Sequence, residues 1–203
     1  TRVEYSLEYG SDALEMHGSV RYAARVDSRT MDPLPTGLVL STPWQDTVVQ
    51  NVKQLLVGGT WTTQSQLSLL MEVWWDGTAP ADAEWDAWAA RNAQLTTLAA
   101  QGAPDAAVAG NLAWQAQAFG VSQNLRRSNV LARLSWQNGA WQPAVDMLYT
   151  PADQGHAVTA AMTWQGDRVQ VQGGWRVFGG PKSAVMAQLP AHSTANVGVT
   201  WAF

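Results

Sequence analysis

Apolar and polar residues alternate over long stretches of the chain. Between Leu14 and Val26 the even positions are apolar or small, and most of the odd positions are polar or charged. Successive side chains of a β-strand point to opposite faces, whereas a helix would place Leu14 and Arg21 on one face. The alternation therefore predicts a strand. Its length exceeds the usual soluble strand of about five or six residues and suits a tilted strand that crosses the ~25 Å apolar band of a membrane.

The same alternation recurs to the end of the chain and predicts nine strands. We place them at 2–9, 13–26, 47–62, 66–76, 125–137, 141–150, 156–165, 167–178 and 194–203. Tight connectors at 64–66, 137–140 and 165–167 alternate with long segments at 28–46, 77–123 and 179–193. Outer-membrane barrels have this rhythm of short periplasmic turns and long outer loops. The predicted fold is an all-β, transmembrane, antiparallel up-and-down β-barrel, with residues 1–203 as a single barrel domain.

The strand count leads to a second expectation. A bacterial barrel that begins and ends in the periplasm needs an even number of strands. Nine strands, the last ending at the periplasmic side, therefore predict at least one further strand before Thr1. A strand at 111–121 would make ten, but it would move the long loop to the short-turn side, so we prefer nine.

Composition favours a membrane strand system over a soluble β-sandwich, which would also show alternation. Only 14% of the residues are charged, against roughly 25% in a typical soluble domain. The chain has 12 tryptophans, whose amphipathic rings suit the two membrane interfaces. Trp61, Trp136, Trp141, Trp164 and Trp201 fall near the short turns, and Trp75 and Trp175 fall near the long loops. We interpret this distribution as two aromatic girdles.

Several classes of partner are disfavoured. The net charge is −4 and there is no basic run, which argues against nucleic acid. The chain has no cysteine, so a disulfide framework and a thiolate metal site are excluded. No apolar stretch reaches the ~18 residues of a transmembrane helix. We expect no cofactor and no metal, because His17, His156 and His192 are not at metal-ligand spacing.

The long extracellular loop at 77–123 contains a predicted helix at about 82–100. This segment is rich in alanine and free of glycine and proline, and Trp85 and Trp88 lie on its apolar face. Pro80 and Asp82 stand where a helix start is expected. We expect the helix to cover the barrel mouth, with Trp85 and Trp88 either packing there or contacting a ligand or partner.

The last strand ends in a recognisable pattern. Asn196, Gly198, Trp201 and Phe203 form a polar residue, a glycine two positions on, and aromatics at the third-last and last positions. This strand resembles the C-terminal β-signal of bacterial outer-membrane β-barrel proteins. The resemblance implies recognition by the barrel assembly machinery and residence in the outer membrane. It covers this strand and, loosely, the hairpin rhythm of the chain, and it carries over no other functional residue.

The polar side of the strands supplies the candidate binding residues. By alternation we expect a lumen lined by Glu15, His17, Arg21, Arg25, Glu72, Arg133, Asp146, Arg168 and Arg176. Five arginines against three acids would make a mildly basic wall that favours anions, because pore selectivity follows the sign of the lining charge. The alternative is that these charges pair across strands, as Arg133 and Asp146 could, and hold a plugged lumen together.

Three functions follow from this sequence. The leading hypothesis is an outer-membrane pore or transporter for small polar or anionic solutes, with the lipid bilayer as its surroundings. The alternative is a non-conducting barrel that anchors or docks a partner through its Trp-bearing loop. The third is an outer-membrane enzyme, a hydrolase at the barrel mouth. Ser68 and Ser135 face inward but lie in no nucleophile motif, so no catalytic residue is assigned.

Overall fold

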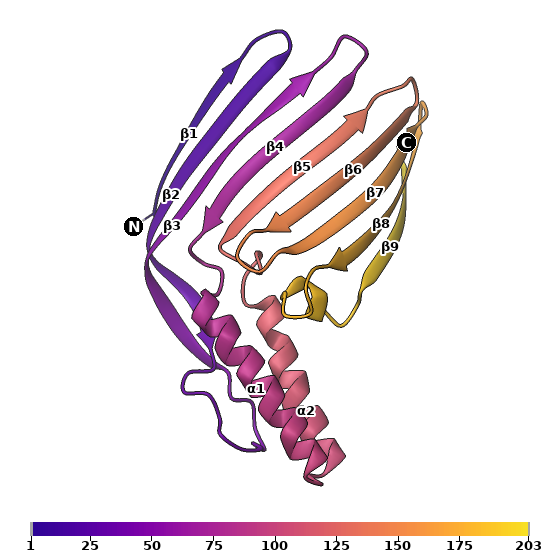
Figure 1. The fold of residues 1–203 in the computed structure, drawn as a ribbon. Coiled ribbons are helices and arrows are strands. Elements are labelled where there is room, and N and C mark those ends of the chain that lie inside the picture. Colours follow the sequence, from indigo (N-terminus) through magenta and orange to yellow (C-terminus); the bar gives the residue numbers. More distant parts are fainter. Residues whose placement is uncertain (1, 203) are drawn as a thin grey trace. The chain divides into compact units, whose positions relative to one another are not determined.

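Nine strands form one sheet in the computed structural model, which describes residues 2–202. The strands lie side by side in chain order, from β1 to β9 (Figure 1). They are β1 (Arg2–Gly10), β2 (Leu14–Thr30), β3 (Gln45–Thr62), β4 (Leu67–Asp76), β5 (Ser128–Trp136), β6 (Trp141–Thr150), β7 (Gly155–Gln165), β8 (Val169–Gly179) and β9 (Ser193–Trp201). The predicted nine-stranded antiparallel sheet is thereby confirmed.

The predicted closure into a barrel is not confirmed. The strand order leaves β1 and β9 as the two edges, and the described sheet is open. Each strand pairs only with its neighbours in sequence, so β1 and β9 each have one partner. A barrel has no such edges, because its first and last strands pair with each other.

The chain divides into two compact units, which are described separately. Unit 2 comprises residues 4–21, 54–75 and 128–203, and so contains part of every strand. Unit 1 comprises residues 1–3, 22–53 and 76–127. The division falls within β2 and β3, so the second half of β2 and the first half of β3 belong to unit 1. Near this division Asn51 has a φ of 55°, a left-handed conformation that asparagine tolerates better than most residues.

The two faces of the sheet in unit 2 differ sharply in chemistry. The register aligns Leu134 of β5 with Val145 of β6, then with Ala160 of β7 and Trp175 of β8. The neighbouring positions on the opposite face carry Arg133, Asp146 and other polar residues. Val145, Trp175 and many other large apolar side chains of the first face are exposed, and others, such as Val130 and Trp164, are half-buried. The apolar side chains of this face therefore do not form a buried core of unit 2.

Unit 1 contains the helices. α1 spans Asp82–Ala100, the range in which the sequence predicts a helix, and α2 (Asp105–Ala116) follows it and continues into the short 3-10 helix η1 (Gln117–Gly120). Gly102, at a φ of 87°, lies in the turn between them; its backbone N–H donates to Ala99 O at 3.0 Å, and this conformation commonly ends a helix. Within residues 2–202, neither helix is long and apolar enough to cross a membrane.

The second helix was not predicted, and the option of a strand at 111–121 is wrong. Residues 111–116 belong to α2 and residues 117–120 to η1. The segment is rich in alanine, which has the highest helix propensity, and its buried side chains Val108, Asn111 and Gln115 recur at helical spacing. α2 packs beside α1, and this partner gives the segment an apolar surface to cover.

Candidate functional site

A row of polar side chains crosses the polar face of unit 2. The register aligns Arg133 of β5 with Asp146 of β6, Thr159 of β7, Arg176 of β8 and Thr194 of β9. Arg133 Nη1 lies 3.2 Å from an Asp146 carboxylate oxygen, and Arg176 Nε donates to Thr159 Oγ1 at 2.8 Å. The ion pair between Arg133 and Asp146, which the sequence analysis gave as an alternative, is present. The Arg176 guanidinium, in contrast, is bonded to a neutral hydroxyl.

A second polar contact joins strands that are not neighbours. His17 Nε2 of β2 lies 2.9 Å from Glu72 Oε1 of β4, although β3 runs between them. Gly58 of β3 makes this reach available. A Cβ at position 58 would lie 2.7 Å from Glu72 Cγ and 2.8 Å from His17 Nε2, closer than van der Waals contact permits. The His17–Glu72 contact therefore depends on the absence of a side chain at position 58.

The remaining predicted lining residues do not form one cluster. Arg21 donates to Gln54 Oε1 at 3.0 Å within unit 2. The side chains of Glu15 and Arg168 have no hydrogen-bond or ion-pair partner among residues 2–202. Arg25 is exposed and belongs to unit 1, not to the polar face of unit 2. That face thus holds an ion pair, a His–Glu pair and separate arginines.

Sequence reasoning missed the acids of β1. Counting back from the hydrogen bond between Ser11 N and Leu14 O aligns Tyr9 with Met16 and Glu8 with His17. Glu8, and Glu4 four residues before it, therefore share the polar face with His17. The signal was the alternation of Glu4, Ser6 and Glu8 with three apolar residues. These acids reduce the basic excess that the predicted lining set implied.

A packed cluster holds the segment between β8 and β9. Asp153 Oδ1 accepts hydrogen bonds from Thr150 Oγ1 at 2.7 Å and Gly155 N at 3.1 Å, and Asp153 Oδ2 accepts one from Val185 N at 2.9 Å. Val185 precedes the 3-10 helix η2 (Met186–Gln188), and Ala184, Val185 and Met186 are buried. One carboxylate thus fixes this segment to the β6–β7 turn. The sequence contained no motif that would have identified it.

Trp85 and Trp88 lie inside unit 1 rather than on its surface. They are 4% and 7% exposed, and their rings pack with each other and with Phe119 at centroid distances of 5.4–5.9 Å. The Trp85 ring N–H donates to Leu125 O at 2.7 Å and that of Trp88 to Gln115 O at 2.9 Å. Both indoles are therefore part of the core that joins α1 to α2 and η1.

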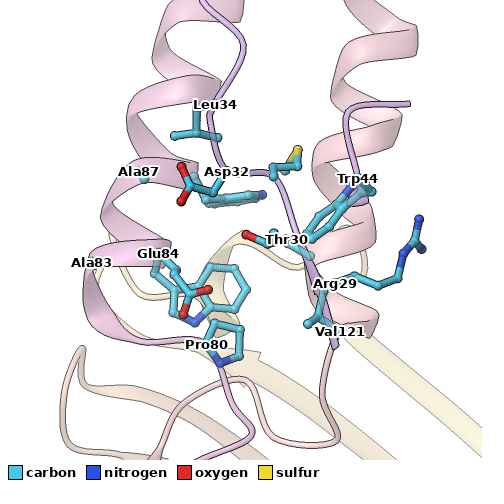
Figure 2. Close-up of a pocket in the computed structure, with 14 residues that line it drawn as sticks. Arg29, Thr30, Asp32, Leu34, Trp44, Pro80, Ala83, Glu84, Ala87 and Val121 are labelled. Atoms are coloured by element: carbon cyan, nitrogen blue, oxygen red, sulfur yellow. The ribbon is translucent and has the colours of Figure 1, made fainter. Parts of the chain in front are cut away.

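A pocket of about 260 Å³ lies against this aromatic core. Trp44, Trp85 and Trp88 contribute to its wall, and Asp32 and Glu84 are its acidic side chains. All its lining residues belong to unit 1. Figure 2 shows Asp32 and Glu84 on the side next to α1, and Arg29 on the other side with its guanidinium pointing away from them.

The segment 31–44 that closes the pocket is held by a buried polar network. Asn111 Oδ1 accepts from Val39 N at 3.2 Å and from Arg91 Nη2 at 3.1 Å, and Asn111 Nδ2 donates to Val39 O at 3.1 Å. Arg91 Nη2 also donates to Gly37 O at 2.6 Å. Arg91 is 3% exposed, and desolvation lowers the pKa of its guanidinium.

The C-terminal pattern lies partly on β9. Asn196 pairs with Gly174 and Gly198 with Gln172 on the polar face, whereas Trp201 pairs with Val169 on the apolar face and is exposed. Phe203 lies outside the described residues. The pattern therefore places Asn196 and Gly198 on one face of the edge strand and Trp201 on the other.

In the described part of the chain, no group of three or more His, Cys, Asp or Glu side chains could hold a metal ion. His17 contacts Glu72, and Ser68 Oγ contacts Thr62 Oγ1 at 2.8 Å. Compared with known proteins, the chain matches no family model and no curated sequence.

Proposed function

We propose that the sheet of unit 2 is part of an outer-membrane β-barrel that acts as a pore or transporter for small polar or anionic solutes. The observation that carries the proposal is the exposed apolar face of the sheet. Exposed large side chains on that face extend from Tyr5 and Leu7 of β1 to Val197 and Val199 of β9. Soluble monomers rarely expose continuous apolar patches above a few hundred Å².

The aromatic residues on this face are consistent with a lipid boundary. Trp61, Trp136, Trp141 and Trp201 are exposed and lie at strand ends next to the short connections. The Trp136 ring N–H donates to Ser65 O at 3.0 Å in one of these turns. Indoles gather at membrane interfaces because the ring is apolar and the N–H is polar. We interpret these tryptophans as an aromatic girdle at the periplasmic interface.

The opposite face suits water. It carries Arg176, which is exposed, and Arg21, which is half-buried, and both donate to neutral side chains; Arg168 is exposed in the turn before β8. The Arg133–Asp146 pair supports the alternative of a non-conducting scaffold, because paired charges stabilise a filled lumen. Closure of the sheet into a barrel also requires that the edges of β1 and β9 be paired. We therefore propose further strands before Thr1, with the whole barrel inserted by the barrel assembly machinery.

Single-channel recording tests the pore. The purified protein, with the further strands proposed before Thr1, should show stable ionic conductance in a planar bilayer, and conductance should rise when residues 77–126 are replaced by a short turn. That replacement is geometrically simple because Asp76 N already donates to Arg127 O at 2.8 Å. The absence of conductance in both proteins, after folding is verified by circular dichroism, would favour the scaffold.

Ion selectivity tests the role of the polar face. Arg176→Glu should lower the anion preference, because its present partner is the neutral Thr159. Lys182→Glu is the matched control, since it makes the same charge change in the segment between β8 and β9. The double variant Arg133→Glu with Arg176→Glu should lower the preference further. Equal reversal potentials in all four proteins would contradict the assignment.

A further inference from the structure

The pocket of unit 1 has an aromatic wall whose polar atoms are already occupied. The ring N–H of Trp44 donates to Trp114 O at 2.8 Å, and those of Trp85 and Trp88 donate to the carbonyls of Leu125 and Gln115. The indoles therefore present only ring carbons to a molecule in the pocket. Such a wall attracts apolar groups, and the negative faces of the rings attract cations.

Two of the three charged groups that line the pocket, Asp32 and Glu84, are acceptors. Asp32 is exposed and has no hydrogen-bond or ion-pair partner among residues 2–202. One oxygen of Glu84 accepts from Ala81 N at 2.6 Å, and no hydrogen bond within the described chain involves the other. Thr30 adds a hydroxyl. A ligand must therefore supply donors, because the carboxylates would repel an anion.

Arg29 does not neutralise this end of the pocket. Its Nε lies 3.7 Å from Asp46 Oδ1, and its guanidinium lies 5.8 Å from the centre of the Trp44 ring. Figure 2 shows the guanidinium pointing away from Asp32 and Glu84. Arg29 thus contacts Asp46 and the Trp44 ring, and within residues 2–202 it forms no ion pair with Asp32 or Glu84.

We propose that this pocket binds a small organic ammonium ion with an apolar body. The body lies against Trp44 and the Trp85–Trp88 cluster, and the ammonium group lies between the carboxylates of Asp32 and Glu84. The pocket volume, about 260 Å³, lies just below the roughly 300–1,000 Å³ of ligand pockets, so the ligand is a single small amine. This inference does not depend on the pore.

Three probes of equal shape test the charge requirement on the full chain. Isothermal titration calorimetry would compare phenethylammonium, the neutral phenethyl alcohol and the anionic phenylacetate. Phenethylammonium should bind most tightly, and its affinity should fall with added salt because the ion pairs are partly exposed. Equal affinity for the ammonium and the alcohol would overturn the proposal. So would preferred binding of phenylacetate, or no binding of phenethylammonium at millimolar concentration.

Two variants locate the site. Asp32→Asn and Glu84→Gln should each weaken phenethylammonium binding by about two- to five-fold, the range of one exposed charge pair, and leave the alcohol unaffected. Glutamine at 84 can still accept the Ala81 N–H, so the helix start is preserved. Asp86→Asn is the control, because this acid is exposed on α1 outside the pocket. The location would be refuted if Asp86→Asn weakened phenethylammonium binding as much as the two pocket variants do. It would also be refuted if the double variant Asp32→Asn with Glu84→Gln bound phenethylammonium as tightly as the natural chain.

Discussion

The substitution Val145→Arg tests whether the apolar face of the sheet contacts lipid. Val145 lies in the middle of β6, is 50% exposed, and stands between Leu134 of β5 and Ala160 of β7. Its neighbours on this face are apolar, and no acidic residue pairs with it there. An arginine at this position therefore has no protein partner and must remain in the medium that covers the face.

The magnitude depends on what that medium is. In a bilayer, arginine at the midplane of a barrel strand costs about 2–4 kcal/mol, which is a roughly 30- to 700-fold smaller folding constant at 1.4 kcal/mol per factor of ten. In water, a half-exposed surface position changes stability by less than about 0.5 kcal/mol. Val171→Arg, nearer a short turn, should cost only about 0–1 kcal/mol in lipid.

The measurement is equilibrium unfolding in urea of the full chain inserted in phosphatidylcholine vesicles, followed by tryptophan fluorescence. Gln142→Arg is the matched control, because Gln142 is exposed in the same strand and lies on the polar face. We expect the order of stability loss to be Val145→Arg, then Val171→Arg, then Gln142→Arg. A loss at position 145 below about 0.5 kcal/mol, or cooperative folding of the natural chain without lipid, would refute the reasoning.

Three packing contacts yield further expectations. Gly58→Ala should destabilise unit 2 by about 1–3 kcal/mol by overpacking and separate His17 from Glu72. Gly110→Ala, with open space around it, should instead stabilise α2 by about 0.5–1 kcal/mol. The urea midpoints of the two variants would show the difference. Asp153→Ala removes three hydrogen bonds and should speed proteolysis within 181–189, mapped by mass spectrometry. Asn111→Ala should cost about 1–3 kcal/mol and speed hydrogen exchange at the Val39 amide; unchanged exchange would contradict the network.

Local pattern was sufficient for the strands. The alternation from Leu14 onward fixed which residues share a face, because the side-chain period of a strand is two and needs no knowledge of its neighbours. The same holds for α1, whose apolar positions recur at helical spacing. It failed for α2, because two of its three buried side chains, Asn111 and Gln115, are polar and do not stand out in a pattern of apolar positions.

The sequence by itself thus determined the strands, their faces and the chemistry of each face. Only the tertiary structure decided which charges meet. The His17–Glu72 contact crosses an intervening strand and depends on the absence of a side chain at Gly58. The pocket joins residues 29–44 to α1, which begins only at Asp82. Such contacts depend on strand register and loop packing, which are set by interactions between segments distant in sequence rather than by the local pattern of either one.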